Sequence, residues 1–403
     1  MTTLAPERAT YADVLRVREF RAMFAADVLS VFGDQVARIA VAVLVYTRTG
    51  SAFAASATYA LSFLTWFVGG PVLSAAADRY PRRTVMVVCD VGRLLLVLSM
   101  CAPGVPLWAF FLALVGVGLL TPPFEAARSG LVADIVTGEL YVAANGLTQT
   151  LAQAGQVGGF LAGGLLVAGL GSRGALLADA ASFGVSAVLV LAAVAHRPAP
   201  QSAPASFLSD TRAGVSLVFG SPELRRLLGY AAVTMAALIA PEGLAVPLAA
   251  ESGHGSVVAG VLMAAGPAGF VVGAALLMRV DTARRAALLP RLAVLACAPL
   301  LLTPLVGPPA LLAGLWLLAG AGGALQVIAN AAFVAAVPPE LRGRAYGVAS
   351  TTLMTVQGGT LLLVGAAAQG LGARWPVAIT AGVVLLMLPV LRGTKEVAAQ
   401  ESG

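Results

Sequence analysis

Asp78-Arg79-Tyr80-Pro81-Arg82-Arg83 carries four formal charges in six residues, within a chain of 403 residues of which only 11% are charged. The apolar stretches 52–76 and 84–103 flank it, and each is long enough to cross the ~30 Å hydrocarbon core of a bilayer as a helix. Because a charged side chain is costly inside hydrocarbon, a cluster between two such stretches is a short turn at a membrane face. A fainter copy, Asp281-Thr282-Ala283-Arg284-Arg285, recurs in the equivalent gap further along the chain.

The rest of the chain is strongly apolar. Hydrophobic residues make up 59% of it and the mean hydropathy is +0.90, whereas roughly 25% of the residues of an ordinary soluble domain are charged. Lipid offers no partners to backbone N–H and C=O groups, so only helices and closed barrels span a bilayer. The apolar runs are continuous and lack the polar/apolar alternation of barrel strands. We therefore predict an all-α polytopic membrane protein.

The distribution of arginine predicts the orientation. Nineteen of the 25 Lys and Arg residues lie at the N-terminus, in the even-numbered gaps between spans or in the C-terminal tail, whereas the odd-numbered gaps hold only Arg48, Arg173 and Arg374. Positively charged loops stay in the cytoplasm, so both termini are expected there. The same rule explains a sequence pI of about 9.6, and no nucleic-acid partner is expected. The first 21 residues lack the apolar core of a secretory signal peptide.

Twelve spans follow from the apolar runs. They are predicted near 22–47, 52–76, 84–103, 106–127, 141–169, 173–195, 224–250, 256–278, 287–306, 309–336, 345–369 and 374–392. The longest gap is rich in proline and divides six spans from six. The predicted parts are a cytoplasmic N-terminal segment (1–21), a six-helix bundle (22–195), a cytoplasmic central linker (196–223), a second six-helix bundle (224–392) and a cytoplasmic tail (393–403).

The two bundles carry traces of an internal repeat. Arg82 and Arg83 recur as Arg284 and Arg285, and six further identities lie 201 positions apart. These identities are Val136/Val337, Glu139/Glu340, Leu140/Leu341, Gly146/Gly347, Thr150/Thr351 and Gln156/Gln357. Six-helix halves related by an axis along the membrane normal are one architecture of transporters, with the substrate route between the halves.

Residues for enzymatic chemistry are scarce. His196 and His254 are the only histidines, and Cys89, Cys101 and Cys297 lie in or beside apolar segments, as buried small side chains do. The sequence has no glycine-rich phosphate loop with its lysine. We predict that the protein is not an enzyme and uses no metal or cofactor.

Ionisable residues inside the predicted spans are the candidates for function, because their insertion costs about 2.5–3.5 kcal/mol each. Asp27, Asp34 and Arg38 share one face of the first span, and Asp34 lies ~18 Å along it, close to the midplane. We predict that Asp34, Arg38 and Asp27 couple transport to protons, with Asp34 pairing with Arg38 in only one protonation state. The alternative is a permanent ion pair between them.

Other polar residues of the spans have less specific interpretations. Asp90 and Arg93 are spaced to pair within the third span. Glu242 in the seventh span contacts either a cationic substrate or outer-side water, and Asp179 is expected near outer-side water. Amides predicted either to line a cavity or to join helices are Gln149, Gln153, Gln326, Asn330 and Gln357. Gly155, Gly159 and Gly163 predict close helix packing.

The charged turn resembles the motif Gly-x-Leu-Ala-Asp-Arg-x-Gly-Arg-Arg of the major facilitator superfamily. The acidic and basic positions match, whereas Ser74 and Pro81 replace its glycines and Ala76 replaces its leucine. The resemblance implies that Asp78, Arg79, Arg82 and Arg83 latch the cytoplasmic sides of the two halves together in the outward-open state. An acidic partner at the end of the fourth span is also implied, which points to Glu125 with Arg82, beside Arg128.

Several other stretches resemble the twelve-span branch of multidrug and macrolide efflux carriers. They are Gly33-Asp34-Gln35, Ala127-Arg128-Ser129, Ala144-Asn145-Gly146 and Pro339-Glu340-Leu341-Arg342-Gly343-Arg344. The fifth span has Gly158-Gly159 where antiporters of the family often carry Gly-Pro. The resemblance implies a monomeric drug:proton antiporter in a bacterial cytoplasmic membrane, exporting a small amphipathic or hydrophobic molecule. Alternatives are a siderophore or metabolite exporter, an importer, or a membrane scaffold or sensor that does not transport.

Overall fold

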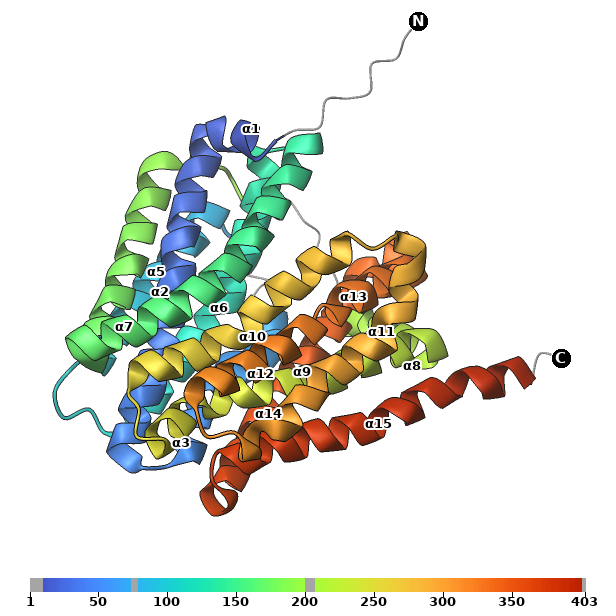
Figure 1. The fold of residues 1–403 in the computed structure, drawn as a ribbon. Coiled ribbons are helices and arrows are strands. Elements are labelled where there is room, and N and C mark those ends of the chain that lie inside the picture. The colour runs from blue at the N-terminus through green and yellow to red at the C-terminus, as the bar shows by residue number, and fades with distance from the viewer. Residues whose placement is uncertain (1–9, 74–78, 200–206, 401–403) are drawn as a thin grey trace, which may run out of the picture.

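The computed structural model describes residues 10–73, 79–199 and 207–400, and these ranges are helical almost throughout and contain no strand. Figure 1 shows the blue-to-green helices mostly on one side and the yellow-to-red helices on the other. The helices are α1 (Tyr11–Arg16), α2 (Arg18–Thr49), α3 (Ala52–Leu73), α5 (Arg82–Met100), α6 (Leu107–Ile135), α7 (Gly138–Ala193), α8 (Phe207–Gly220), α9 (Pro222–Glu251), α10 (Ser256–Met278), α11 (Thr282–Cys297), η1 (Ala298–Leu305), α12 (Pro309–Gly322), α13 (Leu325–Ala336), η2 (Pro339–Leu341), α14 (Arg342–Leu371) and α15 (Arg374–Gln400).

Apart from α1, α8 and η2, and counted with their breaks, these elements form twelve helical segments within the described ranges, as many as the apolar runs of the sequence. Helix α7 supplies two of them, because Gly171 breaks it with a left-handed φ of 72° that glycine adopts at little cost. The 3-10 helix η1 continues α11, and α12 with α13 forms one pass interrupted near Gly323. Eight helices are long and apolar enough to cross a membrane by length and composition.

The segment predicted to be a linker contains a helix. Helix α8 lies between the third proline of this segment, Pro204, and its fourth, Pro222, with Val218 fully buried beside Leu224 and Phe333. Helix α8 packs on α9 and α14. An apolar face in this proline-free stretch explains the helix, because such a face gains free energy by packing on its neighbours.

Close packing within the first half of the chain depends on glycine. We call α1–α7 the first half and α8–α15 the second half. A Cβ atom added at Gly159 would lie 2.6 Å from Cβ of Gln35, and one at Gly163 would lie 3.0 Å from Cα of Val36. Helix α2 therefore lies directly against α7, and this contact fixes where the charged face of α2 points.

The two halves meet where α2 ends and α3 begins, which we call the closed end. Ser56 Oγ donates to the Gly243 carbonyl at 2.8 Å, and Gln369 Nε2 donates to Ser51 Oγ at 3.0 Å. Helix α7 also contacts α10 there, and Ser256 Oγ donates to the Gly164 carbonyl at 2.9 Å. These contacts join the halves at one end of the molecule.

Candidate transport pathway and its charged network

The charged face of α2 carries Asp27, Asp34 and Arg38, and each of these side chains has different neighbours. Nearest the start of the helix, Asp27 is 4% exposed and accepts a hydrogen bond from Arg128 Nη1 at 2.7 Å. Arg128 also contacts Glu125 of its own helix, at 2.5 Å. The structure therefore brings Asp27, predicted for proton coupling, together with Glu125 and Arg128, which the family resemblance implies for the latch.

The basic residues of the charged turn pair with partners in the first half. Arg82 Nη1 contacts Asp134 Oδ2 at 2.6 Å and donates to the Gly130 carbonyl at 2.8 Å, and Arg83 donates to the Leu191 carbonyl. Arg79 is exposed, and Asp78 lies outside the described residues. In this conformation the partner of Arg82 is thus Asp134 instead of the expected Glu125.

The length of α6 explains this difference. The sequence predicts that the helix ends near 127, but it continues through Pro122 and Pro123 to Ile135. Asp134 follows Glu125 by nine residues, or ~13 Å along a helix, so only the later carboxylate reaches the turn. The sequence did offer a signal for this pairing, because Asp134 is an acidic residue between the fourth and fifth predicted spans.

Asp90 and Arg93 form a buried pair within α5, with Arg93 Nη1 3.9 Å from Asp90 Oδ1. Ser186 Oγ donates to Asp90 Oδ2 at 2.6 Å. The Arg93 guanidinium lies 4.6 Å from the ring centre of Phe124, and its Nη2 donates to the Leu120 carbonyl. These partners compensate part of the desolvation of two nearly inaccessible charges.

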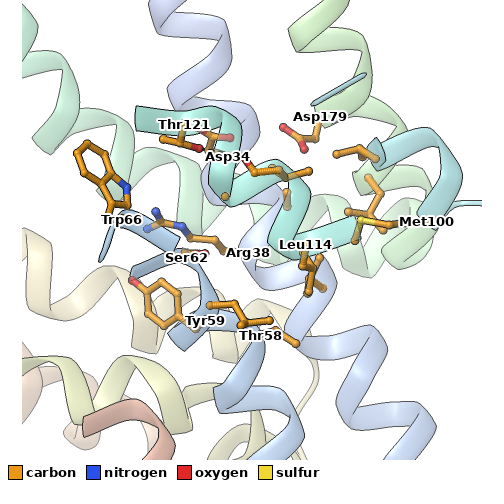
Figure 2. Close-up of a pocket in the computed structure, with 17 residues that line it drawn as sticks. Asp34, Arg38, Thr58, Tyr59, Ser62, Trp66, Met100, Leu114, Thr121 and Asp179 are labelled. Atoms are coloured by element: carbon orange, nitrogen blue, oxygen red, sulfur yellow. Dashed lines mark hydrogen bonds between the residues drawn. The ribbon is translucent and has the colours of Figure 1, made fainter. Parts of the chain in front are cut away.

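A polar cavity of about 110 Å³ lies inside the first half, and Figure 2 shows the side chains around it. Asp34 and Arg38 of α2 line it, with Thr58, Tyr59 and Ser62 of α3. Among the described residues, no ion pair joins Asp34 to Arg38. The Arg38 guanidinium instead lies 5.2 Å from the ring centre of Tyr59.

Tyr59 links this polar cavity to the second half. Its hydroxyl donates to Glu242 Oε2 of α9 at 2.6 Å. The sequence left Glu242 between substrate contact and outer-side water, and the structure places it against a tyrosine at the boundary of the halves. A tyrosine within an apolar run carries little signal of such a role, because aromatic side chains are common in any span.

Asp179 also lines the polar cavity, against the expectation that it lies near outer-side water. It is 2% exposed, and its Oδ1 has no hydrogen-bond partner in the described structure. The second pass of α7 begins at Gly171, so Asp179 lies ~12 Å along it. The predicted span starts at 173, two residues later, so the sequence placed the Asp179 carboxylate too near the membrane surface.

A second, wide cavity of about 710 Å³ lies between the halves, toward the end opposite the closed end. Five of the six predicted cavity residues line it, and Glu242 does not. The amides come from α7, α13 and α14: Gln149, Gln153, Gln326, Asn330 and Gln357. Gln326 Nε2 also donates to the Ala231 carbonyl at 2.9 Å, so this amide joins α13 to α9 as well.

Apolar side chains form most of the remaining wall of the wide cavity. They include Leu227, Met235, Phe270, Phe333 and Met354, and none of the described lining residues carries a formal charge. Apolar walls with a few hydrogen-bonding groups are typical of small-molecule sites.

Two helical bundles around such a cavity, with buried charges in one of them, define a helical membrane transporter. The chain belongs to the Major Facilitator Superfamily, whose sequence profile matches residues 23–308. It is therefore a multi-pass membrane protein.

Bacterial transporters are among its relatives. The chain is 27% identical to the Multidrug efflux pump Tap of Mycobacterium tuberculosis over 403 aligned residues, which cover 91% of this chain and 92% of Tap. It is 26% identical to the uncharacterized MFS-type transporter YfiS of Bacillus subtilis over 261 residues, 63% of this chain and 62% of YfiS. A crystal structure of a POT family transporter in complex with a thioalcohol conjugated peptide has the same fold, with a TM-score of 0.74, 12% identity and coverage of 94% of this chain and 96% of that one.

Proposed function

We propose that this protein is a monomeric, proton-coupled exporter of small, uncharged amphipathic molecules that works by alternating access. The wide cavity is the observation that carries the proposal. Its volume suits a drug-sized molecule, and its amides offer hydrogen bonds without a fixed charge. A cationic or polyanionic substrate would be desolvated there without a counter-charge, which is unfavourable.

The direction of transport follows from charge and from a relative. The arginine distribution assigns the end opposite the closed end to the cytoplasm, together with both termini. The wide cavity then accepts substrate from the cytoplasmic side in this conformation. The name of the relative Tap, a multidrug efflux pump, supports export.

Proton coupling rests on Asp34 and Arg38. When Asp34 is ionised, Arg38 gains electrostatic attraction by turning toward it. When Asp34 is protonated, the Arg38 guanidinium stays over the ring of Tyr59. Tyr59 is hydrogen-bonded to Glu242 across the boundary of the halves. The protonation of Asp34 therefore changes how stable the contacts between the halves are at the closed end. A bound proton can thus change the relative stability of the two conformations, as alternating access requires.

The charged turn supplies the latch of the opposite conformation. Arg79, Arg82 and Arg83 are the basic residues of this latch, and Asp78 of the same motif is expected to act with them. In the opposite conformation Arg82 exchanges Asp134 for a partner in the second half. Asp27 connects this region to α2 through Arg128. Ion pairs that join the two halves at this end would then form only when the wide cavity closes.

Reconstituted vesicles test the proposal. An imposed pH gradient is expected to drive movement of an uncharged amphipathic dye, and Asp34→Asn is expected to abolish that movement while leaving dye binding intact. Glu223→Gln is the matched control, because Glu223 is exposed at the start of α9. Gradient-driven movement in Asp34→Asn at the wild-type rate would refute the coupling, and a panel of neutral and cationic dyes with no movement at all would refute transport.

A further inference from the structure

The polar cavity contains a buried carboxylate that the proposed coupling by Asp34 and Arg38 does not use. Asp179 is 2% exposed and lines this cavity, and its Oδ1 has no partner among the described groups. Ser182 Oγ lies nearby but donates to the backbone carbonyl of Asp179, at 2.7 Å. An ionised carboxylate without hydrogen bonds is strongly destabilised in such a place.

The backbone of α2 brings Asp179 to Asp34. A Cβ atom added at Gly33 would lie 2.6 Å from Asp179 Oδ1, so the carboxylate occupies the space that any larger side chain would fill. The next residue, Asp34, lines the same cavity, and Figure 2 shows the two carboxylates in its upper part. Glycine at this position therefore permits two acidic side chains from α2 and α7 to share one enclosed volume.

The charges around the cavity do not balance these two carboxylates. The charged groups that act on them are Arg38 of α2, Asp90 and Arg93 of α5, and Glu125 of α6. Arg93 is paired with Asp90, and Glu125 is paired with Arg128. Of the α3 side chains that line the cavity, Tyr59 carries the titratable group, its phenol. Arg38 is the remaining cation, so ionisation of both carboxylates leaves one excess negative charge.

We propose that Asp34 and Asp179 form one proton-binding site, in which the two carboxylates share a single proton. Asp179–COOH donates its O–H to the Asp34 carboxylate, or the reverse, and the pair carries one negative charge opposite Arg38. Loss of the proton to water leaves two negative charges close together, and Arg38 then turns from Tyr59 toward them. This inference rests on the proposed proton coupling and adds Asp179 as its second residue.

The pair can be tested without any substrate. Infrared difference spectra between low and high pH are recorded on the purified full-length protein, and proton release is counted in parallel with a pH indicator. The wild type is expected to show the band of one protonated carboxyl group, titrating as a coupled pair. Asp179→Asn is expected to shift the titration of Asp34 to lower pH, and Asp34→Asn to alter that of Asp179, while Glu223→Gln changes neither.

Two further variants keep the test decisive. Asp179→Glu, which retains the acid, is expected to restore the wild-type coupling of the titration, and this also controls for a folding defect in Asp179→Asn. The double variant Asp34→Asn/Asp179→Asn is expected to lose the band completely. An unchanged Asp34 titration in folded Asp179→Asn would overturn the pair, as would displacement of the proton by Na⁺ at constant pH, which would make the cavity a metal-cation site.

Transport measurements separate this inference from the proposed function. Gradient-driven dye movement that survives in Asp179→Asn but not in Asp34→Asn would overturn the role of Asp179 while leaving proton coupling intact. A coupled titration in a protein that moves no dye would instead support the shared proton and refute export. The two failures therefore give different results.

Discussion

At the scale of single residues, Arg128 pairs with two carboxylates at once. It contacts Asp27 of α2 and Glu125 of its own helix, and its side chain is 14% exposed. Removing one partner from a buried charge network is more damaging than removing the whole network, because an unpaired charge stays behind.

Arg128→Met is therefore expected to destabilise the protein by about 3 kcal/mol, since Asp27 loses its partner in a buried position. Thermal unfolding in detergent measures the change. Adding Asp27→Asn to Arg128→Met is expected to recover much of the loss. If the double variant is as unstable as the sum of the single variants, the two side chains do not interact in the membrane protein.

Gly33 is a second sensitive position. The Cβ atom of Gly33→Ala would collide with the Asp179 carboxylate and with Ser182 Oγ, so we expect a lower unfolding temperature and loss of gradient-driven transport. Gly359→Ala is the matched control, because no atom lies within 4 Å of its Cβ position. That control should be as stable as the wild type or more stable by up to about 1 kcal/mol, since alanine favours helix over glycine. Equal stability of the two variants would contradict the contact.

At the scale of elements, the helices were largely predictable and the ends and breaks of helices were not. Hydropathy predicts twelve passes because each must bury about twenty residues in lipid. It does not show that α6 continues past residue 127 to Ile135, which brings Asp134 to Arg82. It also does not give the depth of Asp179, which depends on the break at Gly171. The cavity amides were predictable because uncharged polar residues in a span need either partners or water.

The contact between α7 and α10 sets the closed end. A Cβ atom at Gly164 would lie 2.7 Å from the Ser256 carbonyl oxygen and 3.2 Å from Cα of Gly260. Gly164→Leu is therefore expected to separate the two helices and favour the conformation in which the closed end opens. Gly169→Leu on the same helix is the control, because its Cβ position has no neighbour within 4 Å.

Thiol labelling measures this shift. In a background without Cys89, Cys101 and Cys297, a cysteine introduced at Ser56 is expected to react several-fold faster in Gly164→Leu than in the parent, because the buried position becomes accessible. Gly169→Leu should label at the parent rate. Equal labelling in all three proteins would show that the glycine contact does not hold this end closed.

At the scale of the whole molecule, the bonds between the halves lie at one end and the wide cavity at the other. The described contacts that join the halves at the closed end are hydrogen bonds and close packing. Such interactions are individually weak, at about 1 kcal/mol each. Such an end can open without separating charges.

Covalent closure of this end tests alternating access. With cysteines at Ser51 and Gln369, whose side chains are hydrogen-bonded across the halves, a short thiol-specific cross-linker is expected to abolish transport. Substrate binding from the cytoplasmic side should remain. Each single cysteine variant treated with the same reagent should keep its activity. Transport that continues in the cross-linked protein would rule out opening at this end.

The separation of the two cavities has an evolutionary consequence. The polar cavity is lined only by α2, α3, α5, α6 and α7, whereas most of the wide cavity is lined by α9, α13 and α14. Substitutions on the second half can therefore change the walls of the wide cavity while the polar cavity stays as it is. Under the proposed function, a lineage with this arrangement can acquire new substrates without altering the residues that bind the proton.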